Sequence, residues 1–152
     1  MRLSREGDGW AVRLAAEERE LLARLAGKLR ALVEAGVEAG GVERLFPPAH
    51  EDAREAEELD RLVRPSLVAA KTAALAELER TARAERLTAR ELEAWATALN
   101  DLRLVLGTRH GVEEDPPEER WAEPGIALYG WLSWVQGTVI EALASELPHR
   151  GD

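Results

Sequence analysis

The sequence contains no cysteine, and this absence excludes several kinds of chemistry. Disulfide bonds, thiolate metal sites, cysteine nucleophiles and thiol redox sensors all need a sulfur atom that the chain lacks. Lysine is scarce, with only Lys28 and Lys71, and the single phenylalanine is Phe46. No apolar run approaches the roughly 18 residues of a membrane-spanning helix, and the first residues lack the apolar centre of a signal peptide. We therefore expect a cytoplasmic protein without contact to a membrane.

The charge of the chain is acidic and unevenly distributed. The 152 residues are 45% hydrophobic and carry a formal net charge of -9. Residues 51–60 and residues 111–123 each hold six acids and one arginine, and the remainder of the chain is nearly neutral. Nonspecific binding to nucleic acid depends on a basic surface that neutralises phosphates. The overall charge therefore disfavours direct contact with nucleic acid.

Hydropathy patterns predict a hairpin followed by about five helices. Apolar and polar residues alternate over residues 10–14, after a turn at residues 7–9, which is typical of a hairpin over residues 1–14. Helical periodicity predicts helices over residues 16–35, 51–64, 66–84, 89–109 and 125–147, followed by a tail over residues 148–152. Pro65 separates the second helix from the third, with Ser66 as a cap. We expect one mainly α, bundle-like domain over residues 1–152, with the hairpin packed on its helices.

The helix predicted over residues 89–109 has a wide apolar face with one residue that does not fit it. The face consists of Leu92, Trp95, Ala96, Leu99, Leu102 and Leu106. Arg103 lies within this face, and a guanidinium there needs a carboxylate or a route to water. We predict that Arg103 is mostly buried and paired with a carboxylate of another element. Asp101, Arg103 and Arg109 form a polar network that is either structural, which we favour, or functional.

Residues that could carry catalysis gather in two loops. Two clusters offer nitrogen and oxygen ligands for the divalent metal of a hydrolytic enzyme: His50 with residues 51 and 52, and His110 with residues 113–115. Alternatively, both clusters are solvated polar side chains in loops beside helix ends and bind no metal. The Glu-x-x-His spacing of di-metal bundles occurs only at residues 146–149, where Pro148 interrupts it. The sequence has neither a nucleophile elbow nor a phosphate-binding glycine loop. We predict a protein that is not an enzyme and has no catalytic residues, metal or cofactor, with the metal-dependent enzyme as the alternative.

Two features of the predicted surface point to a partner. One is a stripe of arginines that recur every three or four residues, Arg80, Arg83, Arg86 and Arg90. The stripe offers a basic patch to a phosphate, to DNA or to an acidic protein, unless neighbouring glutamates neutralise it. The other feature is Trp134, which projects to one side of the apolar arc of the last helix. It is either covered by the hairpin or a loop, or it contacts a partner, most simply a second copy of the chain.

Three long segments carry a resemblance to a known family. They are ERLFPPAHEDAREAEELDRLV (43–63), ALNDLRLVLGTRHGVEED (98–115) and ALYGWLSWVQGTVIEAL (127–143). In this order they resemble an actinobacterial family of unknown function, whose members are described as aerial-mycelium-formation proteins or actinomycete oxidative-stress regulators. One branch of the family contacts an alternative sigma factor in transcription and senses oxidation through a Cys-x-x-x-Cys pair, which this chain lacks.

The resemblance implies a cytoplasmic regulatory protein of the stress response. We therefore expect a non-enzymatic regulator that acts through protein–protein contact, with a sigma factor or another part of the transcription apparatus as its partner and without thiol redox sensing. A DNA-binding transcriptional regulator that uses the arginine stripe is a second alternative.

Overall fold

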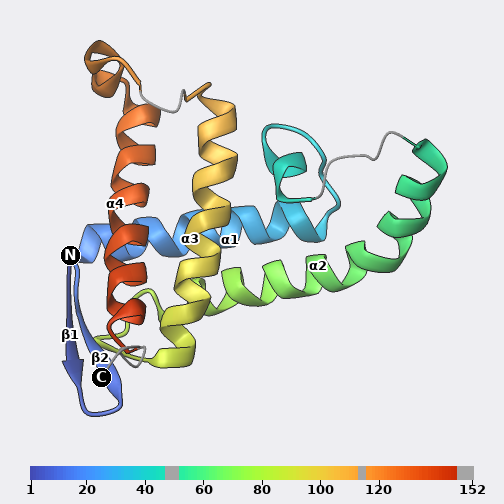
Figure 1. Cartoon of the computed structure of the whole chain (residues 1–152). Helices are drawn as coiled ribbons and strands as arrows, with labels where there is room; N and C mark the ends of the chain where they lie inside the picture. Colours follow the sequence, from blue (N-terminus) through green and yellow to red (C-terminus); the bar gives the residue numbers. More distant parts are fainter. Residues whose placement is uncertain (47–51, 113–115, 147–152) are drawn as a thin grey trace, which may run out of the picture.

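The computed structural model describes residues 1–46, 52–112 and 116–146, which form four helices and one small sheet. Figure 1 shows α3 and α4 standing side by side across α1, while α2 extends to the right from beside the lower part of α3. The strands are β1 (Arg2–Glu6), β2 (Gly9–Arg13) and β3 (Arg86–Thr88), and the α-helices are α1 (Ala16–Glu34), α2 (Ala53–Thr81), α3 (Ala89–Arg109) and α4 (Pro124–Ala144). Two short 3₁₀ helices, η1 (Val42–Leu45) and η2 (Glu118–Ala122), lie in the connections. The prediction of a mainly α fold with an N-terminal hairpin is confirmed.

The hairpin is part of a three-stranded antiparallel sheet. β1 pairs with β2, and β2 pairs with β3, so that Trp10 lies opposite Leu87. Trp10 and Leu87 are both buried against the helices. The third strand was not predicted, and the helix expected to reach residue 84 ends at Thr81. β3 stabilises the hairpin by pairing with β2, since two strands alone are only marginally stable in water.

α2 is one helix of 29 residues, so the prediction of two helices separated at Pro65 is wrong. Pro65 lies on the exposed side of the helix, where the hydrogen bond that it cannot donate is least costly. Figure 1 shows that α2 curves between its N-terminal part and the rest. The neighbouring Arg64 pairs with Asp60 at 2.8 Å and with Glu38 at 2.9 Å, and it lies over the ring of Phe46. The N-terminal cap is Asp52 rather than Ser66.

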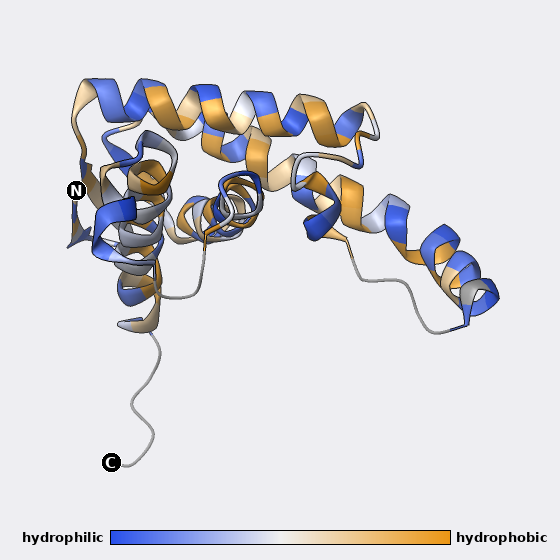
Figure 2. Ribbon diagram, turned by 90° about the horizontal axis from the view of Figure 1, so that it is seen from above, coloured by the Kyte–Doolittle hydropathy of each residue, from blue (hydrophilic) through white to orange (hydrophobic). Residues whose placement is uncertain are grey.

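The hydrophobic core is centred on α3. Trp95 is fully buried, and its indole Nε1 donates a hydrogen bond to Oγ1 of Thr81 on α2 at 2.7 Å. α1 and α2 pack on one side of α3, and α4 packs on another and runs along β1. Seen from above, α3 and α4 are viewed along their axes, and the N-terminal part of α2 extends away from the other helices (Figure 2). α4 therefore lies at the edge of the molecule.

Candidate functional site

The predicted network of Asp101, Arg103 and Arg109 is three separate interactions. Asp101 is 2% exposed, and its two carboxylate oxygens accept hydrogen bonds from Nζ of Lys71 on α2 at 3.2 and 3.3 Å. Burial raises the pKa of the Asp101 carboxyl above its ordinary value, and the Lys71 ammonium opposes that rise. Arg109 donates from Nε to the carbonyl of Gly40 at 2.6 Å and so links the end of α3 to the loop before η1. Each of these contacts joins α3 to another part of the fold.

Arg103 is half-buried and has no carboxylate within 4 Å among the described residues, so the predicted ion pair is wrong. Its Nη1 donates to Oε1 of Gln136 on α4 at 2.8 Å, and its guanidinium lies 5.7 Å from the ring centre of Tyr129. The physical reason is the composition of α4, where Glu141 is the sole charged residue and lies too far along the helix to pair with it. An amide and an aromatic ring take the place of the carboxylate.

The arginine stripe is largely neutralised by carboxylates. Arg80 pairs with Glu77 at 2.7 Å and with Glu91 at 2.8 Å, and Arg83 pairs with Glu20 at 2.5 Å. Arg86 donates to the Glu6 carbonyl at 2.7 Å and also lies 3.8 Å from a carboxylate oxygen of Asp8, whereas Arg90 is exposed and has no ion pair among the described residues. Ion pairs between exposed side chains contribute little to stability, but they cancel the field that would attract a phosphate.

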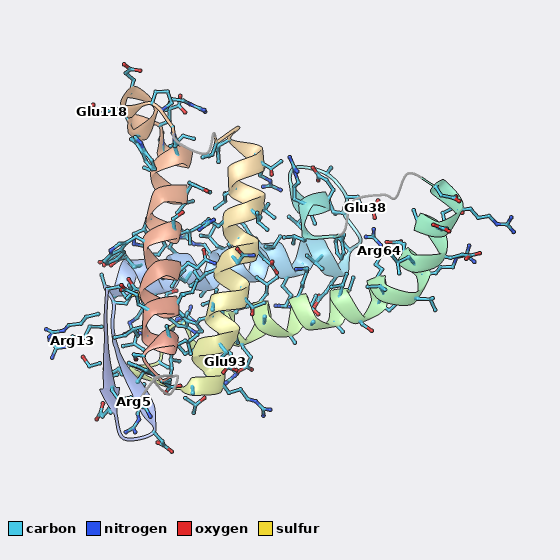
Figure 3. The ribbon with its side chains drawn as sticks, viewed as in Figure 1. Arg5, Arg13, Glu38, Arg64, Glu93 and Glu118 are labelled. Carbon is cyan, nitrogen blue, oxygen red and sulfur yellow. The ribbon has the colours of Figure 1, made fainter. Side chains whose placement is uncertain are left out.

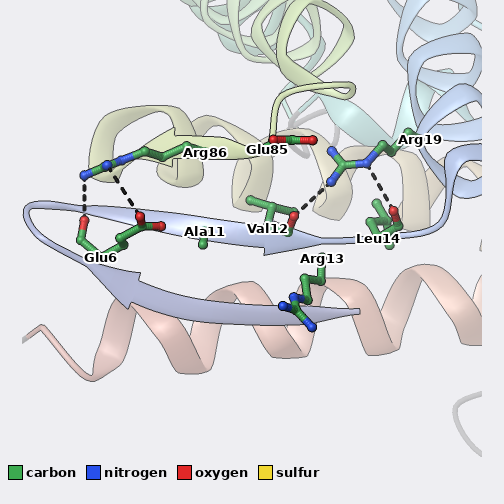
Figure 4. Close-up of a pocket in the computed structure, with 8 residues that line it drawn as sticks. All are labelled: Glu6, Ala11, Val12, Arg13, Leu14, Arg19, Glu85 and Arg86. Atoms are coloured by element: carbon green, nitrogen blue, oxygen red, sulfur yellow. Dashed lines mark hydrogen bonds and ion pairs between the residues drawn. The ribbon is translucent and has the colours of Figure 1, made fainter.

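A shallow pocket lies between the hairpin and the start of α1, and Arg19 occupies one side of it (Figure 4). The guanidinium of Arg19 donates to four backbone carbonyls, those of Val12, Leu14, Ala82 and Ala84, at 2.6 to 3.1 Å. These bonds connect the hairpin, α1 and the turn after α2. Arg19 could not be singled out from the sequence, because its partners are backbone atoms of separate segments of the chain. Its donors are engaged within the chain, so the pocket has a structural explanation.

The two histidine clusters are only partly described. Residues 50 and 51, residues 113–115 and His149 lie outside the described residues. His110 ends α3, is exposed, and lies against Gly125, where an added Cβ would be 2.3 Å from its Nδ1. Within the described ranges, no three histidine, aspartate or glutamate side chains gather as metal ligands would. In the same part of the chain, none of the helices has the length and apolar character needed to cross a membrane.

Trp134 lies on the outer face of α4 and is 51% exposed. The sequence left open whether the hairpin or a loop covers this side chain. Neither the hairpin nor a described loop does so. α4 contacts α3, β1 and η2, and its Trp131 donates a hydrogen bond to Glu18 of α1, whereas the side that carries Trp134 is exposed. A helix with one charged residue in 21 is ordinarily buried on all sides. Around Trp134, the outer face of α4 is therefore a largely apolar helix surface that the other described residues leave exposed.

Trp121 of η2 extends this surface. Its ring lies on Gly130, where an added Cβ would stand 2.5 Å from Cζ3 of the indole, and 41% of its surface is exposed. Gly130 precedes Trp134 by four residues, so the two tryptophans lie one turn apart along the same side of α4. Gly137 follows on the same side, and nothing lies within 4 Å of the position its Cβ would take. We call Trp121, Gly130, Trp134 and Gly137 the aromatic face.

The aromatic face is bordered by acidic residues. Glu118, Glu119 and Glu123 lie at the η2 end, and Glu141 lies on the same side of α4 beyond Gly137. All four are exposed. Figure 3 shows Glu118 at the η2 end of α4, whereas Arg13 of the neighbouring hairpin points away from α4. Arg120 is the one basic residue of η2, and its guanidinium donates to the carbonyls of residues 110 and 111 and to Glu123.

Together, the fold and this surface define a small helical domain that presents an aromatic, acid-bordered helix face. The chain belongs to the family described as "Domain of unknown function (DUF2017)", which matches residues 1–143. No curated protein matches the chain, and no solved structure matches it either.

Proposed function

We propose that this protein is a non-enzymatic regulator that acts by binding another protein through the outer face of α4. The observation that carries the proposal is the exposure of Trp134, 51%, on a helix that is apolar on nearly all sides. Full burial of a tryptophan removes about 150–250 Å² from water, and tryptophan is enriched among the residues that dominate binding energy. Trp134 is 51% exposed and Trp121 is 41% exposed, so a partner that covers both would bury about as much area as one tryptophan.

Within this proposal, the protein is a cytoplasmic member of the actinobacterial regulators of aerial mycelium formation and oxidative stress, and its partner belongs to the transcription apparatus, with a sigma factor as the leading choice. The support is the resemblance of residues 98–115 and 127–143; residues 98–109 of the first segment belong to α3, and the whole second segment belongs to α4. The second of these segments contains Trp134. Because the chain has no cysteine, the contact is regulated without thiol oxidation.

The test is capture of partners from cells of the source organism with the tagged full-length chain, compared among three forms. Trp134→Ala removes the anchor. Ile140→Ala is the matched control, since Ile140 is 49% exposed and projects about 120° around the same helix from Trp134. We expect a defined protein that is enriched by the wild type and by Ile140→Ala and is lost with Trp134→Ala at unchanged melting temperature. Equal capture by all three forms would contradict the proposal.

A further inference from the structure

The charges around the aromatic face indicate which kind of partner it takes. From residue 118 to the end of α4 at residue 144, the chain has four glutamates and one arginine, and the arginine is engaged by backbone carbonyls and Glu123. Carboxylates therefore stand at both ends of an uncharged strip that contains Trp121 and Trp134. A binding surface of this kind favours a partner with apolar side chains in its centre and positive charge at its ends.

A second copy of this chain does not fit the surface. If two α4 helices packed antiparallel about a two-fold axis near Trp134, Glu141 of each copy would lie beside residues 118–123 of the other. Carboxylates would then face carboxylates at both ends of the interface, and like charges brought together at an interface are costly. The net charge of -9 adds a long-range repulsion between copies.

We propose that the aromatic face binds a positively charged amphipathic segment of another protein. Apolar side chains of that segment cover Trp121 and Trp134. Its lysines or arginines pair with Glu141 at one end and with the glutamates of η2 at the other. Gly137 has open space above it and lets the partner approach the backbone of α4 closely. This inference rests on the proposed function and adds the chemical class of the partner.

The test uses three synthetic peptides of roughly four helical turns each. The first has a leucine stripe and a polar face of lysine and arginine. The second has the same stripe with glutamate in place of each basic residue, and the third is a scrambled form of the first without a stripe. Binding to the full-length protein is followed by calorimetry and by tryptophan fluorescence, because Trp121 and Trp134 are the two most exposed tryptophans among the described residues.

We expect the basic amphipathic peptide to bind at least about tenfold more tightly than either control peptide, a difference of about 1.4 kcal/mol. Trp121→Ala and Trp134→Ala should each weaken it about tenfold, as expected for an anchor residue. Glu141→Gln should weaken it about two- to threefold and reduce its salt dependence. Ile140→Ala should leave it unchanged within about twofold, which separates the surface from the general attraction of a basic peptide to an acidic protein.

Three results would overturn the inference: equal binding of the acidic and basic peptides, binding that survives both tryptophan substitutions, or a wild-type dimer in sedimentation that Trp134→Ala converts to a monomer. The capture experiment has a different readout. If a partner is captured through Trp134 but the peptides show no preference for positive charge, the inference fails and the proposed function stands. If nothing is captured through Trp134, the proposed function fails whatever the peptides show.

Discussion

Lys71→Met tests how the carboxylate of Asp101 is accommodated between α2 and α3. Asp101 is 2% exposed, and Lys71 supplies both of its side-chain hydrogen bonds. Methionine keeps the aliphatic stem and removes the charge, so the carboxylate must remain ionised without a partner or take up a proton. From its ordinary pKa of 3.8, protonation at pH 7 costs about 4 kcal/mol, at about 1.36 kcal/mol per pH unit.

That cost sets the scale of the effect. We expect Lys71→Met to lower the free energy of unfolding by about 2–4 kcal/mol at pH 7. Asp101→Asn should lower the free energy of unfolding by less, about 1–2 kcal/mol. The reason is an asymmetry of exposure, since 17% of the Lys71 side chain is exposed against 3% for Asp101, and the freed ammonium can turn toward water.

The two variants should also differ in their dependence on pH. Without Lys71, the pKa of the folded Asp101 carboxyl lies further above its ordinary value, so the folded variant holds a proton that the unfolded chain has released. The stability of Lys71→Met relative to the wild type is therefore lost as the pH rises from the ordinary pKa of 3.8 toward 7. It is recovered as the pH falls toward about 4. Urea unfolding at about pH 4.5 and pH 7 measures this. An equal loss of stability at both pH values, or a larger loss for Asp101→Asn than for Lys71→Met, would contradict this expectation.

Three further substitutions have expected outcomes. Gly130→Ala should displace the ring of Trp121, raise its acrylamide quenching and weaken the basic peptide, while the melting temperature changes little because alanine favours helix by about 1 kcal/mol. Unchanged quenching would contradict this. Arg103→Leu should cost about 1–2 kcal/mol, because its hydrogen-bond partner is the neutral amide of Gln136; a loss of about 3–5 kcal/mol would instead indicate a buried ion pair. Arg19→Lys should cost about 2–3 kcal/mol and speed hydrogen exchange in β2, since lysine cannot reach four carbonyls, and unaltered exchange there would count against it.

Local patterns predicted most of the secondary structure. The capping box of Thr88 and Glu91 begins α3, with reciprocal hydrogen bonds of 2.9 and 3.1 Å. Gly36 follows α1 with a φ of +72°, the left-handed conformation that ends helices. These features depend on residues a few positions apart, which the sequence displays directly.

The failures arose where distant segments decide the outcome. α2 continues through Pro65 because the proline faces solvent and Arg64 binds Glu38 and the ring of Phe46, contacts that depend on the η1 loop. β3 is three residues long, too short for an alternating pattern, and its pairing depends on where the hairpin lies. The ion pair predicted for Arg103 failed because the helix that packs against it has an amide at that place.

Only part of the aromatic face could be predicted from the sequence, again because contacts between distant segments determine which side chains are exposed. The helical wheel placed Trp134 to one side of the apolar arc, but whether it was covered depended on the path of the hairpin. β1 runs along another side of α4, where Arg5 pairs with Glu146, and leaves Trp134 exposed. Trp121 was not singled out, since it lies in the acidic connection and meets Gly130 only after η2 folds back on α4.

If the outer face of α4 binds another protein, site-specific photo-crosslinking will trap that contact in cells. A photoreactive phenylalanine analogue is placed at position 134, and at position 140 as the control, in the full-length chain within cells of the source organism. We expect a covalent adduct with one other polypeptide from position 134 and not from position 140. Adducts only with a second copy of this chain, or the same adducts from both positions, would contradict it.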